Sequence, residues 1–130
     1  MSDKKIILIV DDDPDYLEQL DIYVKSFGFD TILASSQKQA EEILENTKPD
    51  LIISDLMMEK EDSGFILAYK TKKKYPELPI IIATAVSSDT GFVFEAENKF
   101  EQSWIKADKY MEKGIRPDQL HREIKKLLKL

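Results

Sequence analysis

Short apolar runs alternate along the chain with longer stretches in which apolar residues recur at helical spacing. The runs are rich in isoleucine, valine and leucine and lie at residues 6–10, 31–34, 51–54, 80–83 and, with a weaker pattern, 109–111. They show little alternation of apolar and polar positions, which is typical of strands buried on both faces of a sheet. The pattern therefore predicts five strands that are buried on both sides.

The stretches between the runs carry helix start and stop signals. Five helices are expected: from the cap Asp13 and Pro14 to the stop at Gly28; from the cap Ser36 to before Pro49; from Asp62 or Ser63 to near Pro76; over residues 93–104; and from Pro117. Strand followed by helix, five times, predicts an α/β fold. We expect one doubly wound, five-stranded parallel sheet with helices on both faces.

Composition narrows the class of protein. A chain of 130 residues is expected to form a single domain, residues 1–130. The absence of cysteine excludes disulfides, thiolate metal sites and a thiol nucleophile. No apolar run approaches the roughly 20 residues of a membrane span, and no signal-peptide core follows the N-terminus. We therefore expect a cytoplasmic protein without a membrane partner.

The net charge of −6 predicts no direct binding of nucleic acid or anionic lipid by the chain as a whole. A local run of lysines lies within residues 70–74 and is interpreted as the solvent-exposed face of a helix. The chain's single histidine, His121, is expected to be an exposed helical residue.

Acidic and polar side chains gather where the predicted strands end. Asp11, Asp12 and Asp13 follow the first run, and Asp55, Thr84 and Lys113 follow the third, fourth and fifth. Ligands of open parallel sheets bind beyond the carboxyl ends of the strands. Asp13 stands before Pro14 and is better explained as a helix cap than as a ligand. The other five residues are the candidate site.

Carboxylates that lie close together repel by roughly 4 kcal/mol per pair at about 4 Å and an effective dielectric of about 20, so a cluster favours a bound cation. Mg²⁺ prefers hard oxygen ligands, which Asp11, Asp12 and Asp55 would supply. A carboxylate beside such an ion can act as a nucleophile toward a phosphoryl group, with Asp55 as acceptor. Thr84 and Lys113 would neutralise the oxygens of the transferred group.

Four stretches, "ILIVDDDPD", "PDLIISDLMM", "PIIIATA" and "ADKYMEKG", resemble the receiver domains of two-component response regulators, in family order and over nearly the whole chain. The resemblance implies a flavodoxin-like receiver fold with bound Mg²⁺. It implies the following roles: Asp11 and Asp12 as the metal-binding pair, Asp55 as the phosphorylated residue, the backbone carbonyl of Met57 as a further metal ligand, Thr84 and Tyr110 as the switch residues, and Lys113 as the lysine of the site.

The same resemblance implies a signalling domain rather than an enzyme, apart from its own phosphorylation and slow autodephosphorylation. The implied partner is a histidine kinase or a histidine-containing phosphotransfer protein. The implied output is a protein-binding face formed by the fourth helix, fifth strand and fifth helix, which could also serve a phosphorylation-dependent homodimer. We expect no output domain within residues 1–130.

Several positions depart from the family pattern. Gly114 replaces the proline whose cis peptide helps to aim the lysine, and "DLMMEKEDSG" lacks the usual proline after Asp55. The long, aromatic segment 86–106 is expected to form a partner surface or an extra packed turn. Met57 and Val86 occupy the two positions that influence phosphoryl loss in the family. Both are apolar, so neither can position water, and a long-lived phosphorylated state is predicted.

Two other functions share parts of this sequence pattern. A receiver-like interaction module that signals without phosphorylation is consistent with the departures at Gly114 and after Asp55. A phosphatase of the haloacid dehalogenase class also uses an aspartate after its first strand, but "DDDPD" places Asp15 where that class has threonine or valine. The four glycines of the chain form no Gly-rich phosphate loop, which argues against a nucleotide-binding enzyme.

Overall fold

The computed structural model describes residues 4–56, 58, 63–84 and 107–130, and at Thr84 the backbone only. Its strands are β1 (Ile6–Val10), β2 (Asp30–Ala34), β3 (Leu51–Asp55), β4 (Ile80–Thr84) and β5 (Lys109–Glu112). Its helices, within these described ranges, are α1 (Pro14–Ser26), α2 (Gln37–Asn46), α3 (Ser63–Lys74) and α5 (Pro117–Leu128). The helix predicted over residues 93–104 and the aromatic segment 86–106 lie outside the described residues.

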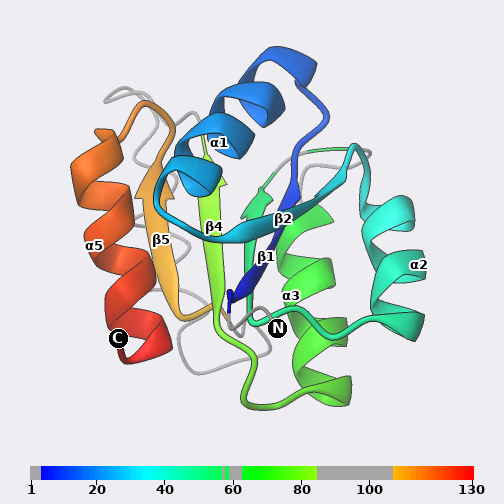
Figure 1. Ribbon diagram of the computed structural model, residues 1–130. Coiled ribbons are helices and arrows are strands. Elements are labelled where there is room, and N and C mark those ends of the chain that lie inside the picture. Colours follow the sequence, from blue (N-terminus) through cyan, green and yellow to red (C-terminus); the bar gives the residue numbers. More distant parts are fainter. Residues whose placement is uncertain (1–3, 57, 59–62, 85–106) are drawn as a thin grey trace.

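The strands form one five-stranded parallel sheet in the order β2-β1-β3-β4-β5. Helices α1 and α5 cover one face of this sheet, and α2 and α3 cover the other (Figure 1). The chain leaves β1 toward β2 on one side and later returns to β3 on the other, which makes the carboxyl end of β1 the switch point of the sheet. The predicted fold class is confirmed.

Two hydrophobic cores lie on opposite faces of the sheet. Ile7 and Ile9 of β1 pack with α1 and α5, whereas Leu8 and Val10 pack with α2 and α3. Successive side chains of a strand point to opposite faces, so one run of apolar residues fills both cores. This explains the absence of alternation in the sequence of β1, and the same holds for β3.

The prediction of burial on both sides is right for the central strands and wrong for the edge strands. β2 contains exposed and half-buried positions, and Leu33 is 38% exposed. In β5, Met111 is the one buried residue. Among the residues that the structure describes, each of these strands has a hydrogen-bonded neighbouring strand on one side only, and the helices cover it incompletely.

Local signals placed the helix ends correctly. The Asp13 carboxylate accepts hydrogen bonds from the N–H groups of Asp15, at 3.0 Å, and Tyr16, at 3.5 Å, and so caps α1. Ser36 caps α2 by accepting the Gln39 N–H at 3.0 Å. Gly28, with a φ of +97°, follows the end of α1 in a conformation that favours glycine.

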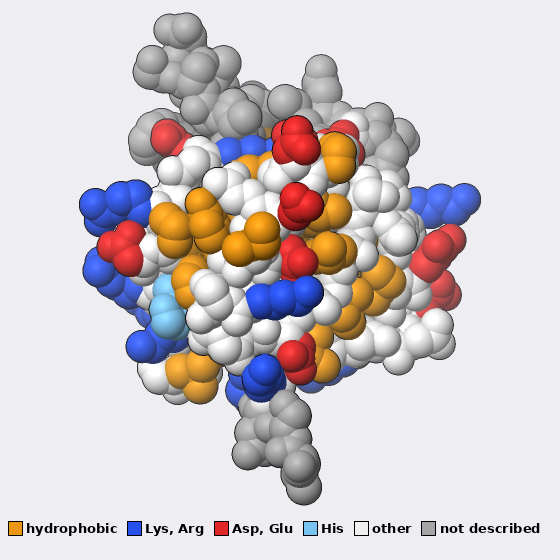
Figure 2. Space-filling view, turned by 45° about the horizontal axis from the view of Figure 1, so that its top comes forward, with side chains coloured by type: hydrophobic (Ala, Val, Ile, Leu, Met, Phe, Trp, Pro, Cys, Tyr) orange, Lys and Arg blue, Asp and Glu red, His pale blue; other side chains and the backbone are white. Residues whose placement is uncertain are grey.

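Charged and hydrophobic side chains share the outer surface. Figure 2 shows a row of acidic and basic side chains between groups of hydrophobic ones. In the lysine run of α3, the expectation of a solvated face is only partly right, because Lys72 is half-buried and forms an ion pair with Asp108 at 2.9 Å. Among the described residues, no helix combines the length and apolar character needed to span a membrane.

The expectation that His121 is an exposed helical residue is wrong. It is half-buried, and its ring stacks on Phe27 with the ring centroids 4.2 Å apart and the planes 3° apart. Phe29 meets the same ring edge-on at 6.2 Å. The histidine therefore joins α5 to the end of α1 by aromatic packing.

Candidate functional site

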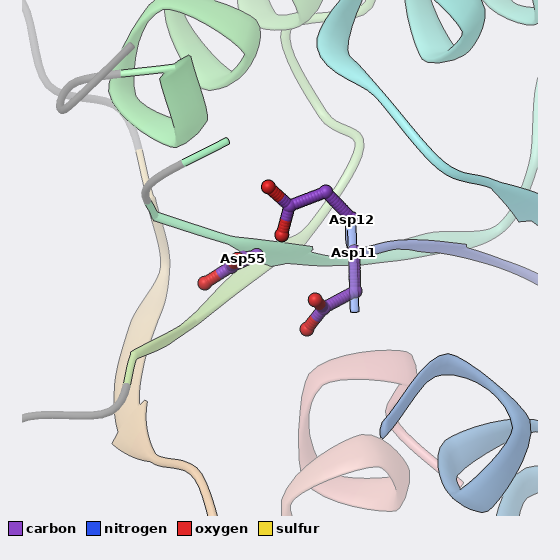
Figure 3. Close-up of side chains that lie close together, drawn as sticks. All are labelled: Asp11, Asp12 and Asp55. Carbon is purple, nitrogen blue, oxygen red and sulfur yellow. The ribbon is translucent and has the colours of Figure 1, made fainter. Parts of the chain in front are cut away.

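The acidic side chains predicted to form the site converge at the carboxyl edge of the sheet. Asp11 and Asp12 follow β1, and Asp55 ends β3, the neighbouring strand (Figure 3). One carboxylate oxygen from each of the three lies within 4.8 Å of the others. Asp11 and Asp55 are 1% and 6% exposed, whereas Asp12 is exposed. The cluster thus has a buried floor and one side open to solvent.

Lys113 reaches this cluster from the end of β5. Its Nζ atom lies 2.9 Å from Oδ2 of Asp11 and 3.3 Å from Oδ1 of Asp55, and its side chain is only 18% exposed. The peptide bond between Lys113 and Gly114 is trans, as are the other peptide bonds of the described residues. The lysine therefore reaches the position that the sequence predicted, although glycine follows it.

The protonation of Asp55 reflects its surroundings. Burial, and after it the negative charge of Asp11, raises the pKa of Asp55 from 3.8 to about 6. The ammonium of Lys113 opposes this shift but does not cancel it. Burial lowers the pKa of Lys113, but the hydrogen bond to Asp11 and the charges of both aspartates outweigh burial and raise it. Lys113 is therefore fully charged at neutral pH. Asp55 is also ionised at neutral pH, but its ionisation costs free energy in the folded state.

Gly64, at the start of α3, supports the backbone of the site and was not singled out in the sequence. Its N–H donates a hydrogen bond of 2.7 Å to the carbonyl of Leu56, directly after Asp55. A Cβ atom at Gly64 would lie 2.7 Å from the Cα of Leu56 and even closer to the carbonyl oxygen of Asp55. Only glycine lets α3 approach this closely.

Tyr16, in the first turn of α1, is a second residue that sequence reasoning missed. The Nζ atom of Lys113 lies 4.9 Å from the centroid of its ring. Burial raises the pKa of the Tyr16 hydroxyl, and the nearby backbone of Gly114 and the positive charge of Lys113 oppose this shift. The contact joins residues almost a hundred positions apart, and no spacing rule could have found it.

The remaining predicted residues are placed as follows. The backbone of Thr84 ends β4 and pairs with Glu112, next to Lys113. Tyr110 of β5 is half-buried on the face covered by α3, and its ring meets Phe65 edge-on with centroids 6.1 Å apart. The side chain of Thr84, and the whole of Met57 and Val86, lie outside the described residues.

A doubly wound parallel sheet with carboxylates and a lysine at its switch point defines an α/β domain whose site suits a cation beside an anionic group. The family model described as the response regulator receiver domain matches residues 7–125. The chain belongs to this family.

Similar curated proteins are response regulators. The phosphate regulon transcriptional regulatory protein PhoB of Pseudomonas aeruginosa is 32% identical over 127 residues, which are 96% of this chain and 52% of that protein. The heme response regulator HssR of Staphylococcus saprophyticus is 36% identical over 123 residues, covering 94% of this chain and 50% of that protein. The chain thus spans about half the length of these relatives.

Solved structures show the same fold. A CheY-like receiver domain protein from Methanospirillum hungatei superposes with a TM-score of 0.79 at 26% identity, covering 97% of this chain and 94% of that one. The response regulator TrrA from Thermotoga maritima, in complex with Mg²⁺ and BeF, has a TM-score of 0.76 at 28% identity, covering 95% and 98%. The predicted family and receiver fold are confirmed.

Proposed function

We propose that Asp55 accepts a phosphoryl group from a phosphohistidine donor while Mg²⁺ is bound beside it. One observation carries the proposal: the carboxylate oxygens of Asp11, Asp12 and Asp55 lie within 4.8 Å of one another, and Lys113 contacts two of these residues. A cluster of this kind provides negative charge for a cation and positive charge for a phosphoryl group in the same place.

The donor set fits magnesium. Three carboxylates are hard oxygen ligands, and the exposed side of Asp12 leaves room for water and for a phosphate oxygen. Asp11, Asp12 and Asp55 would hold the ion, with the backbone carbonyl of Met57 as a further ligand by family resemblance. When bound, Mg²⁺ would neutralise charge on the cluster and on the incoming phosphoryl oxygens.

The transfer requires few groups from this chain. A carboxylate oxygen of Asp55 forms the new O–P bond as the P–N bond to the donor imidazole breaks, and the imidazole nitrogen keeps the electron pair. Lys113 lies 3.3 Å from Asp55 and would hold a phosphoryl oxygen there by charge. The hydroxyl of Thr84 would donate a second hydrogen bond. Slow hydrolysis of the acyl phosphate would return the carboxylate.

The signal would leave the site through Thr84 and Tyr110. Movement of Thr84 toward the phosphoryl group would change the space available to Tyr110, shifting a two-state balance. Two contacts support this route. Tyr110 is half-buried, and its ring meets that of Phe65. Phe65 follows Gly64, and Gly64 packs against the backbone of Asp55 and Leu56. The output face would include β5, α5 and the helix predicted over residues 93–104.

The partners follow from this chemistry. A histidine kinase or a histidine-containing phosphotransfer protein in the cytoplasm would supply the phosphoryl group. A downstream protein, or a second copy of the chain after phosphorylation, would bind the output face. His121 is not proposed as the donor, because it packs on Phe27 at the end of α1 and is not part of the acidic cluster.

The test is phosphorylation by a small donor. Wild-type protein, Asp55→Asn and the matched control Asp15→Asn are incubated with acetyl phosphate and Mg²⁺, and their intact masses are measured. Asp15 is exposed and lies outside the acidic cluster. We expect the mass gain of one phosphoryl group in wild type and Asp15→Asn, reversed by hydroxylamine, and none in Asp55→Asn. A folded wild-type protein without the gain would favour the interaction module that acts without phosphorylation.

A further inference from the structure

The position of Lys113 has to be fixed by its surroundings, because the residue after it restricts the backbone little. Gly114 has a φ of +92°, and nothing lies within 4 Å of the place where a Cβ would stand. Glycine leaves the chain free to adopt many conformations, so it does not by itself aim the preceding side chain. The contacts of the lysine side chain must therefore do so.

Two of these contacts are the ion pairs with Asp11 and Asp55. Both carboxylates belong to the cluster proposed to hold Mg²⁺, so the same oxygens would be shared with the ion. A cation that binds there weakens the hold of the aspartates on the lysine, because two positive charges then compete for the same negative ones. A third contact that binds no metal would keep the lysine in place.

Tyr16 provides such a contact. The centroid of its ring lies 4.9 Å from the Lys113 Nζ atom. The residue is half-buried at the start of α1, where the Asp13 cap holds its backbone N–H. An aromatic face attracts an ammonium group without offering a ligand to Mg²⁺.

We propose that Tyr16 is a positioning residue for Lys113, because the face of its ring attracts the ammonium group of the lysine. The lysine is then held from the α1 side whether or not a cation occupies the aspartates. The effect on phosphoryl transfer rests on the proposed function of Asp55, whereas the placement of the lysine does not.

The first measurement needs neither metal nor phosphoryl donor. A proton above an aromatic ring is shifted upfield, so the ε-methylene signals of Lys113 report its contact with Tyr16 in metal-free protein. They are assigned by their loss in Lys113→Arg. We expect the shift in wild type and Tyr16→Phe, and its loss in Tyr16→Leu and Tyr16→Met. Tyr23→Leu is the matched control, because Tyr23 is on the same helix and its hydroxyl accepts a hydrogen bond from Gln19, away from the site.

The second measurement is the rate of phosphorylation by acetyl phosphate with Mg²⁺. We expect a fall of about fivefold in Tyr16→Leu and Tyr16→Met, a smaller fall in Tyr16→Phe, and none in Tyr23→Leu. In a Lys113→Ala background, Tyr16→Leu should have no further effect, since it acts through the lysine. A merely structural role would slow both backgrounds equally.

The outcomes separate the two proposals. Unshifted Lys113 signals in wild type, or an unchanged rate in every Tyr16 variant, would overturn the positioning role. A wild-type protein that shows the Lys113 shift, loses it in Tyr16→Leu and yet accepts no phosphoryl group would overturn the function proposed for Asp55 and leave the placement of Lys113 supported.

Discussion

The ammonium group of Lys113 lies closer to Asp11 than to Asp55, with Nζ 2.9 Å from Oδ2 of Asp11 and 3.3 Å from Oδ1 of Asp55. The other oxygen of Asp11 accepts the N–H of Asp13 at 2.8 Å. Both oxygens of Asp11 are therefore engaged within the chain, and a cation that binds Asp11 must share it with the lysine.

Removal of the lysine should therefore strengthen magnesium binding. We expect Lys113→Ala to bind Mg²⁺ about tenfold more tightly than wild type at pH 7, since one positive charge close to the ion is lost. Isothermal titration measures the constant. Lys109→Ala is the control, because Lys109 is also on β5 but pairs with Glu123 at 3.9 Å. An unchanged constant in Lys113→Ala would show that the lysine and the ion do not compete.

Asp55 should reduce the stability of the metal-free protein at neutral pH. Because its pKa is raised from 3.8 to about 6, the folded state holds a proton that the unfolded state releases between these values. Protonated Asp55 therefore favours the folded state, and this contribution to the free energy of unfolding is fully present below about pH 4 and is lost as the pH rises through 6. Asp55→Asn, which stays neutral, should raise the free energy of unfolding by about 1–2 kcal/mol at pH 7.5 and by little at pH 4.

Urea unfolding in the presence of a chelator measures this difference at both pH values. Asp15→Asn serves as the control, because the exposed Asp15 should change stability little at either pH. An Asp55→Asn variant that is less stable than wild type at pH 7.5 would contradict the burial and charge argument for Asp55.

A side chain at Gly64 should displace the backbone that carries Asp55. In Gly64→Ala the new Cβ would overlap the backbone at Asp55 and Leu56, so we expect a loss of about 2–3 kcal/mol in the free energy of unfolding. Magnesium affinity should fall as well, because the strand end that carries Asp55 must shift. Gly28→Ala is the comparison: Gly28 has a positive φ but open space around it, so that variant should lose about 1 kcal/mol and leave magnesium binding intact.

A buried hydroxyl in α3 offers a stabilising substitution. Thr71 is 3% exposed, and among the described residues its Oγ1 is the buried side-chain polar atom that has no hydrogen-bond partner. Thr71→Val keeps the shape and should raise the free energy of unfolding by about 1 kcal/mol. Thr31→Val should do the opposite, because the Thr31 hydroxyl donates a hydrogen bond of 2.6 Å to Asp21. Urea unfolding of both variants checks the pair.

The phosphorylated form should be long-lived. Met57 and Val86 are apolar and cannot orient an attacking water by hydrogen bonding, which is a prediction from the sequence alone. A radiolabel chase on phosphorylated wild type should show label that persists well beyond seconds. Met57→Asn should lose it faster, because an amide can hydrogen-bond a water molecule. Loss within seconds from wild type would contradict the argument.

The parts of the fold that could be predicted are those that depend on residues adjacent in the sequence. Asp13 before Pro14, Ser36 and Gly28 marked helix ends correctly, because a cap needs only a few consecutive residues. The central strands were recognised because burial on both faces removes alternation. The exposure of β2 was missed, since position in a sheet depends on the order of strands and not on the strand's own sequence.

The part of the site that could be predicted from the sequence consists of the residues that follow the predicted strands. Asp11, Asp12, Asp55 and Lys113 follow predicted strands, and parallel strands bring such residues to one edge. Tyr16 and Gly64 were not predictable in this way. Tyr16 acts through the surface of its ring, and Gly64 through the absence of a side chain, so both depend on how α1 and α3 pack against the strand ends.

The two hydrophobic cores on either side of β1 restrict which mutations this strand can tolerate. Adjacent residues of β1 serve opposite layers, and the acidic pair follows directly on them. Insertion or deletion of one residue in this strand would exchange the layers and turn the pair away from its neighbours. Natural variants and engineered libraries should therefore tolerate other apolar side chains at positions 7–10 while keeping the length of that segment constant.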